Sequence, residues 1–209
     1  MGADLGVIIP SLFVPWSAMG VRAVFLVGFM ASGKTTVGQE LAQRLGWDFV
    51  DLDAQIESRE QQPIAEIFRD RGEHQFRLVE ASALRDLMES LDRDTVVALG
   101  GGTFAQPGNR ELLRPWPSVF LDTPLDDLWR RSREDEKRPL RKDDRTEFAR
   151  LHEDRLPFYR EATVTVVTSG KDPASLCVEI ESRLHFGGRT EDAGSSEVPP
   201  GHSGTGESQ

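Results

Sequence analysis

The chain has one cysteine, fewer basic than acidic side chains, and no long apolar run. Cys177 stands alone among 209 residues, so the chain can form no internal disulfide and has no cluster of thiolates for zinc. The 35 Asp and Glu residues outnumber the 25 Lys and Arg, and a net charge of −10 argues against a broad basic face for nucleic acid or an anionic membrane. Since no stretch of about 18 uncharged apolar residues occurs, no membrane span is predicted. We therefore expect a soluble, cytoplasmic protein that holds any phosphate by local contacts.

The two ends of the chain differ in composition from the middle. Residues 1–20 contain two prolines and no basic residue, which disfavours a secretory signal and predicts an unstructured extension. The sequence leaves open whether translation starts at Met1 or Met19. Residues 187–209 are rich in Gly, Ser, Pro and acids, so we expect a disordered tail. A single domain is predicted over residues 21–186.

Within this domain, short apolar runs alternate with segments of helical periodicity. Five strands are predicted, at Ala23–Gly28, Phe49–Asp53, Thr95–Gly102, Ser118–Asp122 and Thr163–Thr168. Helices are predicted around Val37–Gly46, Pro63–Phe68, Phe76–Leu91, Leu125–Trp129 and Pro173–Leu184. Strands separated by helices pair in parallel through right-handed crossovers, which predicts an α/β three-layer sandwich with a five-stranded parallel sheet. Ligands of such folds bind beyond the carboxyl ends of the strands.

A glycine-rich loop follows the first predicted strand. Residues Gly28 to Thr35 are GFMASGKT, which fits G-x-x-x-x-G-K-[ST] between a strand and a helix. The backbone N–H groups of such a loop and the helix N-terminus attract phosphate. Lys34 is predicted to reach the β- and γ-phosphates, and the Thr35 hydroxyl to bind Mg²⁺. The loop predicts a P-loop protein that binds a nucleoside triphosphate, but it does not identify the reaction.

Two acids end the second predicted strand. Asp51 and Asp53 are two residues apart, so on an extended strand they would share a face with Cα atoms about 6.5 to 7 Å apart. One could support the metal while the other orients and deprotonates an acceptor hydroxyl. Taken by itself, the pair is better explained as solvated strand-end acids or as a helix cap.

Three further signals are weak one by one. The Gly100–Gly102 run directly follows the third strand, where bare backbone lets a ligand approach closely. Residues 131–145 are too polar for a core and fit either a solvated loop or a mobile flap whose arginines contact phosphates. Arg77 and Arg155, taken alone, are explained as solvated arginines.

Together these segments resemble shikimate kinase, a small P-loop kinase related to the nucleoside monophosphate kinases. The resemblance covers about residues 21–184 and rests on the P-loop and five further motifs in order, FVDLD, IAEIFRDRGEHQFR, ALGGGTF, KRPL and RLPFYREA. Two departures are Ala31, where glycine is common, and Arg141, where an apolar residue is usual. The resemblance implies transfer of the γ-phosphoryl group of ATP to the 3-hydroxyl of shikimate, a step of aromatic amino acid biosynthesis. It also implies Mg²⁺ as cofactor, a monomer, and a mobile lid over about residues 132–146.

The resemblance further implies roles for individual residues. Lys34, Asp53 and Arg138 are the implied catalytic residues, with Asp53 as the base and Arg138 as the lid arginine. Asp51 supports Mg²⁺ through water beside Thr35. The residues implied for ATP are Gly28, Ser32, Gly33, Lys34, Thr35, Thr36, Val37, Gly38, Arg131 and Arg138, with Lys171 as a looser match near the adenine. Those implied for shikimate are Asp53, Arg77, Gly100, Gly101, Gly102 and Arg155, with the two arginines on its carboxylate.

Two alternatives remain open. A kinase of another small polyol acid, such as gluconate, has the same kind of acceptor, and ADP formation with each acceptor distinguishes the two. A non-catalytic nucleotide-binding or ATPase module would instead use Asp122, at the end of the fourth strand, as its metal-binding acid. The Thr123-Pro124 pair after it is typical of a helix start, so a capping or structural role is expected for Asp122.

Overall fold

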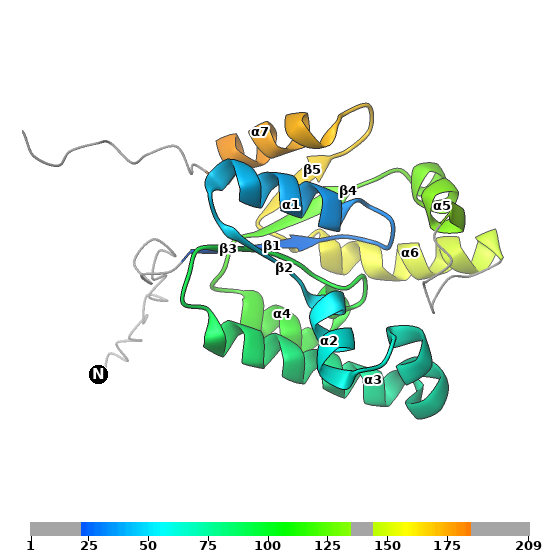
Figure 1. Cartoon of the computed structure of the whole chain (residues 1–209). Coiled ribbons are helices and arrows are strands. Elements are labelled where there is room, and N and C mark those ends of the chain that lie inside the picture. The colour runs from blue at the N-terminus through cyan, green and yellow to red at the C-terminus, as the bar shows by residue number, and fades with distance from the viewer. Residues whose placement is uncertain (1–21, 135–143, 185–209) are drawn as a thin grey trace, which may run out of the picture.

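The computed structural model describes residues 22–134 and 144–184, which form a sheet between two layers of helices (Figure 1). The sheet has five parallel strands in the order β2-β3-β1-β4-β5, so the predicted α/β class and sheet are confirmed. The strands are β1 (Ala23–Val27), β2 (Asp48–Asp51), β3 (Thr95–Ala98), β4 (Ser118–Asp122) and β5 (Val164–Val167). The helices are α1 (Lys34–Leu45), α2 (Leu52–Glu60), α3 (Ile64–Ser90), the 3-10 helix η2 (Thr103–Ala105), α4 (Pro107–Leu113), α5 (Leu125–Glu134), α6 (Arg145–Tyr159) and α7 (Pro173–Leu184).

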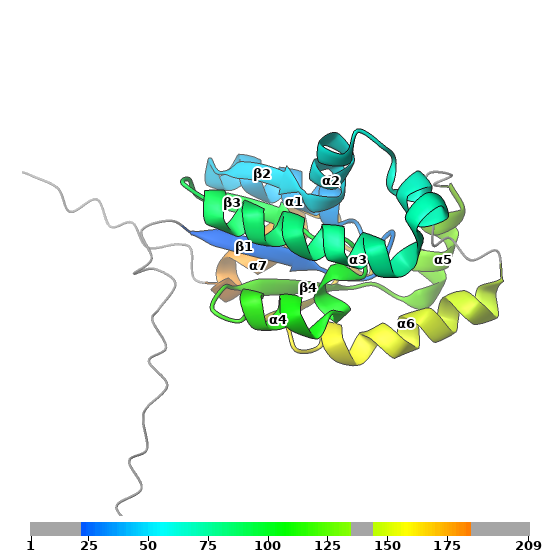
Figure 2. The same cartoon turned by 90° about the horizontal axis from the view of Figure 1, so that it is seen from below.

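Side-chain alternation along the strands divides the core into two halves. In β1, Val24 and Leu26 join the cluster formed with α1 and α7 on one face, whereas Phe25 and Val27 join the cluster under α3 and α6. Figure 2 shows α3, α4 and α6 together on this second face. Because helices cover both faces, every residue of β1 is buried, which explains why it is a continuous apolar run.

Several helix boundaries follow the sequence signals. Helix α1 ends at Gly46, which adopts a left-handed conformation with φ 67° and closes the last turn. Asp172 precedes α7, and its carboxylate accepts a hydrogen bond from the backbone N–H of Ser175 at 2.7 Å. Helix α3 is interrupted at Gly72, with φ 77° and ψ 167°, so the predicted pair of helices is one element with a break in it. The predicted end of the first helix at Gly46 is confirmed, and the helices predicted around Pro63–Phe68 and Phe76–Leu91 lie on either side of the break at Gly72.

The end of the second strand was predicted wrongly. Strand β2 stops at Asp51, and helix α2 begins at Leu52, so Asp53 lies in the first helical turn and not on an extended strand. The Asp51 side chain accepts hydrogen bonds from the N–H groups of Asp53 and Ala54, which starts the helix. The helix cap that the sequence left as an alternative for this pair is therefore correct for Asp51.

Other boundaries and elements also departed from prediction. Strand β3 ends at Ala98, so the run of glycines forms a turn outside the strand. Helices α2, α4 and α6 were not predicted; α6 contains Pro157 and many charged residues, which obscure its periodicity. The predicted lid, residues 132–146, overlaps the end of α5 and the start of α6, and its residues 135–143 lie outside the described part of the chain. The predicted N-terminal extension, residues 1–20, and the predicted C-terminal tail, residues 187–209, also lie outside the described part of the chain.

Strand β1 lies in the middle of the sheet, where the strand order reverses: β2 and β3 lie on one side of it, and β4 and β5 on the other. β1 pairs with β3 on one side and β4 on the other, and the glycine-rich loop leaves its carboxyl end. Residues that follow β2 and β3 reach the same edge of the sheet because all the strands are parallel. None of the described helices is long and apolar enough to cross a membrane.

Close packing of α1 against the sheet makes Gly38 sensitive to substitution. A Cβ at this position would lie 2.5 Å from Cε2 of Phe49 and 3.2 Å from Cδ1 of Leu26. We expect Gly38→Ala to lower the free energy of unfolding by about 1 to 3 kcal/mol, because the Phe49 ring or the helix must shift to make room. Urea denaturation measures this change. The control is Gly108→Ala in α4, where an added Cβ meets nothing within 4 Å; an equal loss there would show that packing at Gly38 is not the cause.

Candidate functional site

A cavity of about 920 Å³ opens at the carboxyl ends of β1, β2 and β3. Its walls come from the loop after β1, the start of α2, the kinked helix α3, the turn after β3, single residues of α5 and α6, the loop after β5, and the first turn of α7. Of the residues predicted from sequence, it is lined by Ser32, Gly33, Lys34, Thr35, Thr36, Val37, Asp51, Asp53, Arg77, Gly100, Gly101, Gly102, Arg131 and Arg155. The volume is within the range of sites that hold small-molecule ligands.

The loop between β1 and α1 forms the phosphate-binding part of this cavity. Ala31 and Gly33 both have positive φ, at 62° and 94°, so the chain curls before it enters α1. Ala31 therefore adopts a conformation that glycine reaches at lower cost. The N-terminus of α1 opens into the cavity, where its N–H groups attract an anion.

Lys34 lies against its own loop. Its ammonium group is buried and donates hydrogen bonds to the carbonyl oxygens of Gly28 and Phe29, each at 2.9 Å. These two contacts place the ammonium group at the start of α1, beside the N–H groups of its first turn. This charge and the helix N-terminus together favour a bound phosphate chain.

Asp51 connects the loop to the second strand. The Thr35 hydroxyl donates a hydrogen bond to Oδ2 of Asp51 at 2.7 Å, while Oδ1 of the same carboxylate caps α2. A hydroxyl and a carboxylate are oxygen ligands of the kind that Mg²⁺ prefers, with phosphates and water filling its other positions. Among the described residues no group of three or more His, Cys, Asp or Glu could hold a metal by itself. The pair fits Mg²⁺ shared with a nucleotide.

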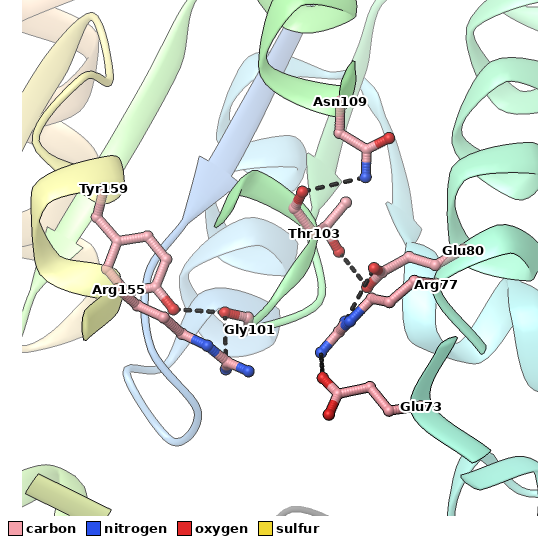
Figure 3. A network of polar contacts seen from close by, with 8 residues as sticks. All are labelled: Glu73, Arg77, Glu80, Gly101, Thr103, Asn109, Arg155 and Tyr159. Atoms are coloured by element: carbon pink, nitrogen blue, oxygen red, sulfur yellow. Dashed lines mark hydrogen bonds and ion pairs between the residues drawn. The ribbon is translucent and has the colours of Figure 1, made fainter. Parts of the chain in front are cut away.

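Arg77 pairs with two acids at the edge of the cavity (Figure 3). Its Nη1 donates to Glu80 at 2.9 Å and its Nη2 to Glu73 at 3.0 Å, and its guanidinium lies within 6 Å of the rings of Phe68 and Phe76. Burial lowers the pKa of Arg77, but the charges and hydrogen bonds of Glu80 and Glu73 outweigh burial and leave that pKa above its usual value. The group is permanently charged.

Glu80 is a site residue that sequence reasoning missed. Its side chain is only 1% exposed, and Oε1 accepts a hydrogen bond from the Thr103 hydroxyl at 2.6 Å. The amide of Asn109 in turn donates to the carbonyl oxygen of Thr103 at 3.1 Å. Glu80 thus joins α3 to η2 and orients Arg77. The signal in the sequence was the spacing of Arg77 and Glu80, since residues three apart on a helix lie close enough to pair.

Arg155 approaches the cavity from the opposite side. It is 7% exposed, lies in α6, and donates through Nη1 to the carbonyl oxygen of Gly101 at 3.2 Å. The hydroxyl of Tyr159 donates to the same oxygen. In Figure 3 the guanidinium groups of Arg155 and Arg77 extend toward each other from the two sides of Gly101. Two cations facing one cavity suit a planar carboxylate.

The three glycines make room for groups of the protein itself. A Cβ on Gly100 would lie 2.5 Å from Oδ1 of Asp53, and one on Gly102 would lie 2.5 Å from Nη1 of Arg77. A Cβ on Gly101 would lie 3.3 Å from the backbone nitrogen of Met30 in the phosphate loop. The sequence predicted space for a ligand here, and the structure adds that this turn brings the three parts of the site together.

Some predicted residues lie elsewhere. Gly28 and Gly38 do not line the cavity; Gly28 packs against Ser32 and the backbone of Leu121, and Gly38 packs against the sheet. Arg138 lies outside the described residues. Asp122, the metal-binding acid of the alternative ATPase hypothesis, does not line the cavity either. The acid that contacts the Thr35 hydroxyl is Asp51 instead.

A family model, curated relatives and a solved structure match most of this chain. The model of the shikimate kinase family matches residues 30–185. A shikimate kinase of Persephonella marina is 40% identical over 165 residues, which cover 78% of this chain and 99% of that protein. One of Geobacter metallireducens is 41% identical, over 78% of this chain and 92% of its own length. A solved shikimate kinase from Acinetobacter baumannii in complex with shikimate has a TM-score of 0.74 and 36% identity, covering 82% of this chain and 98% of that one.

Tyr159 is the only tyrosine of the chain, so its titration can be observed directly. Burial raises the pKa of its phenol to about 12, and the nearby charge of Arg155 only partly opposes this rise. The unfolded chain ionises near pH 10, so this residue favours folding below that pH, and the effect is lost as pH rises toward 12. We expect absorbance at 295 nm to show almost no tyrosinate in the folded protein at pH 10.5. Half-ionisation at that pH without unfolding would contradict the buried hydrogen bond.

Proposed function

The chain belongs to the shikimate kinase family, and from this premise we propose that it transfers the γ-phosphoryl group of ATP to the 3-hydroxyl of shikimate. The observation that carries the proposal is one cavity that joins a P-loop to Asp53, Arg77 and Arg155. The phosphate loop supplies the donor half of this cavity. The acid and the two arginines suit a hydroxylated carboxylate, which is the chemistry of shikimate.

On the donor side, backbone N–H groups of the loop and the N-terminus of α1 hold the phosphates of ATP. Lys34 turns from its loop carbonyls to the β- and γ-phosphates, where its charge offsets the charge of the transferring group. Arg131 and Lys171 line the same cavity and contact the adenine end. Arg138, from the segment outside the described residues, acts at the phosphates as the lid arginine.

On the acceptor side, Arg77 and Arg155 bind the carboxylate of shikimate from opposite sides. The ring hydroxyls then face Asp53, which lies at the start of α2 against Gly100. Asp53 orients the 3-hydroxyl and accepts its proton as the oxygen attacks the γ-phosphorus, while the bond to the β,γ-bridging oxygen breaks and ADP leaves. The catalytic contribution of the protein is mainly positioning and charge.

As the cofactor, Mg²⁺ would be held by the Thr35 hydroxyl and, through water, by Asp51. When bound, it neutralises charge on the β- and γ-phosphates. The hydrogen bond between these two side chains keeps their oxygens together at the loop. Asp51 also fixes the start of α2, so the carboxylate that serves the metal places Asp53 as well.

The catalytic domain spans residues 21–186, which is supported by the family match over 30–185. It acts on shikimate and ATP as a monomer, without nucleic acid. A gluconate kinase would also need a site for a hydroxylated carboxylate, so the acceptor assay below separates it from this proposal. A bare ATPase that uses Asp122 is disfavoured because that acid does not line the cavity.

The proposal is tested by ADP formation with defined acceptors. We expect turnover with shikimate and none above background with gluconate or without acceptor. Asp53→Asn should lower kcat by about 10²- to 10⁴-fold, because the acceptor proton loses its base, with nucleotide binding largely unchanged. Arg77→Ala should also abolish turnover and spare nucleotide binding, and Lys34→Ala should slow the chemical step.

Asp122→Asn is the matched control for Asp53→Asn, since it removes the same charge from a strand end outside the cavity. We expect it to retain wild-type activity. An active Asp53→Asn variant, or ADP release that needs no acceptor, would refute the proposed mechanism.

The metal role of Asp51 makes a separate prediction. Asp51→Asn keeps the shape of the side chain and one capping oxygen but removes its charge. We expect the Mg²⁺ concentration for half-maximal activity to rise about tenfold, as for loss of an outer-sphere group. The Asp122→Asn variant serves again as control, and an unchanged Mg²⁺ requirement in Asp51→Asn would assign Asp51 to capping alone.

A further inference from the structure

Arg77 is paired with two acids that differ greatly in exposure. Glu80, three residues later on α3, is 1% exposed, whereas Glu73, four residues earlier, is 58% exposed. Figure 3 shows the guanidinium held between these two carboxylates. The cavity is lined by Arg77 and Glu80 but not by Glu73. The two acids therefore have different parts in the site.

Glu80 is a permanent partner of the arginine. One of its oxygens accepts from Nη1 of Arg77 and the other from the hydroxyl of Thr103, so both are occupied. Displacing it would leave a buried charge without a partner, which is strongly unfavourable. An incoming ligand cannot take the place of this carboxylate.

Glu73 makes a weaker and incomplete contact. It accepts one hydrogen bond from Nη2 of Arg77, while Nε of the same guanidinium is buried and has no hydrogen-bond partner among the described residues. The Nε–Nη2 edge is the one through which arginine donates two parallel hydrogen bonds to a single carboxylate. Here that edge is half-filled by an exposed side chain. A better-placed carboxylate could form both bonds.

We propose that Glu73 is a stand-in for the carboxylate of the acceptor, and that shikimate displaces it from Arg77. This inference rests on the proposed function, because it requires an acceptor that carries a carboxylate. Glu73 follows Gly72, where α3 is broken, so its side chain can leave without disturbing an intact helix before it. Glu73 thereby weakens binding of the acceptor, and its charge repels any second carboxylate that approaches.

Loss of Glu73 should lower the KM for shikimate, whereas general damage to the protein would raise it. Exposed ion pairs contribute little, so removing the competitor should lower the KM for shikimate about two- to fivefold. Glu73→Gln makes this change and keeps the size and helix propensity of the side chain. The KM for ATP should stay the same, because Glu73 pairs with Arg77, which binds the acceptor and not the nucleotide.

The experiment measures initial rates of wild type, Glu73→Gln and a charge control. Glu89→Gln is the control, since Glu89 is exposed on the same helix and lies twelve residues, about 18 Å, beyond Arg77. The inhibition constant of shikimate methyl ester, whose carboxylate is blocked, is measured with each variant and should not respond to Glu73→Gln.

A KM for shikimate that is unchanged or higher in Glu73→Gln would overturn the inference. So would an equal drop in the Glu89→Gln control, or an equal drop in the inhibition constant of the ester, since either result would be a general charge effect. If the wild type formed no ADP with shikimate, the proposed function would fail first. Activity of the wild type together with an unresponsive Glu73→Gln would refute only the role of Glu73.

Discussion

The turn after β3 is the constraint on which the site depends, because three parts of the protein meet where Gly100, Gly101 and Gly102 have no side chains. Asp53, the phosphate loop and Arg77 each approach to within 3.3 Å of a position that a Cβ would occupy. The carbonyl oxygen of Gly101 also receives hydrogen bonds from Arg155 and Tyr159. The distance between the donor half and the acceptor half of the cavity is therefore set by the contacts that side chains and the phosphate loop make with the backbone of this turn. A turn with side chains would push these halves apart.

Positive charge is concentrated at this turn in a protein whose net charge is −10. Lys34, Arg77 and Arg155 all line one cavity, and each is largely withdrawn from water. Withdrawal strengthens their attraction for phosphate and carboxylate, because the surrounding dielectric is lower than that of water. Each cation is held by protein oxygens, so it is already placed when a ligand arrives. Local arrangement replaces the broad basic surface that the composition lacks.

Asp51 shows how one residue can serve the fold and the site together. Its carboxylate starts helix α2 and accepts from the hydroxyl of Thr35, so the end of β2, the new helix and the phosphate loop are joined at one group. The pattern D-x-D suggested two acids on one strand face, which was wrong because capping bends the chain after the first acid. Both acids nevertheless line the cavity. The sequence predicted two acids at the site, but the position of Asp53 depends on the hydrogen bond by which Asp51 caps α2.

The sequence by itself determined the parallel sheet, the phosphate loop and the residue types of the site, because these depend on local periodicity and on short motifs. It indicated Asp53, Arg77 and Arg155 only through resemblance, since each is unremarkable in its own segment. The partnership of Glu80 with Thr103, and of Tyr159 with Gly101, was decided by the tertiary structure. Those residues are 23 and 58 positions apart in the chain, and only burial between packed elements brings them within hydrogen-bond distance and requires each polar group to find a partner.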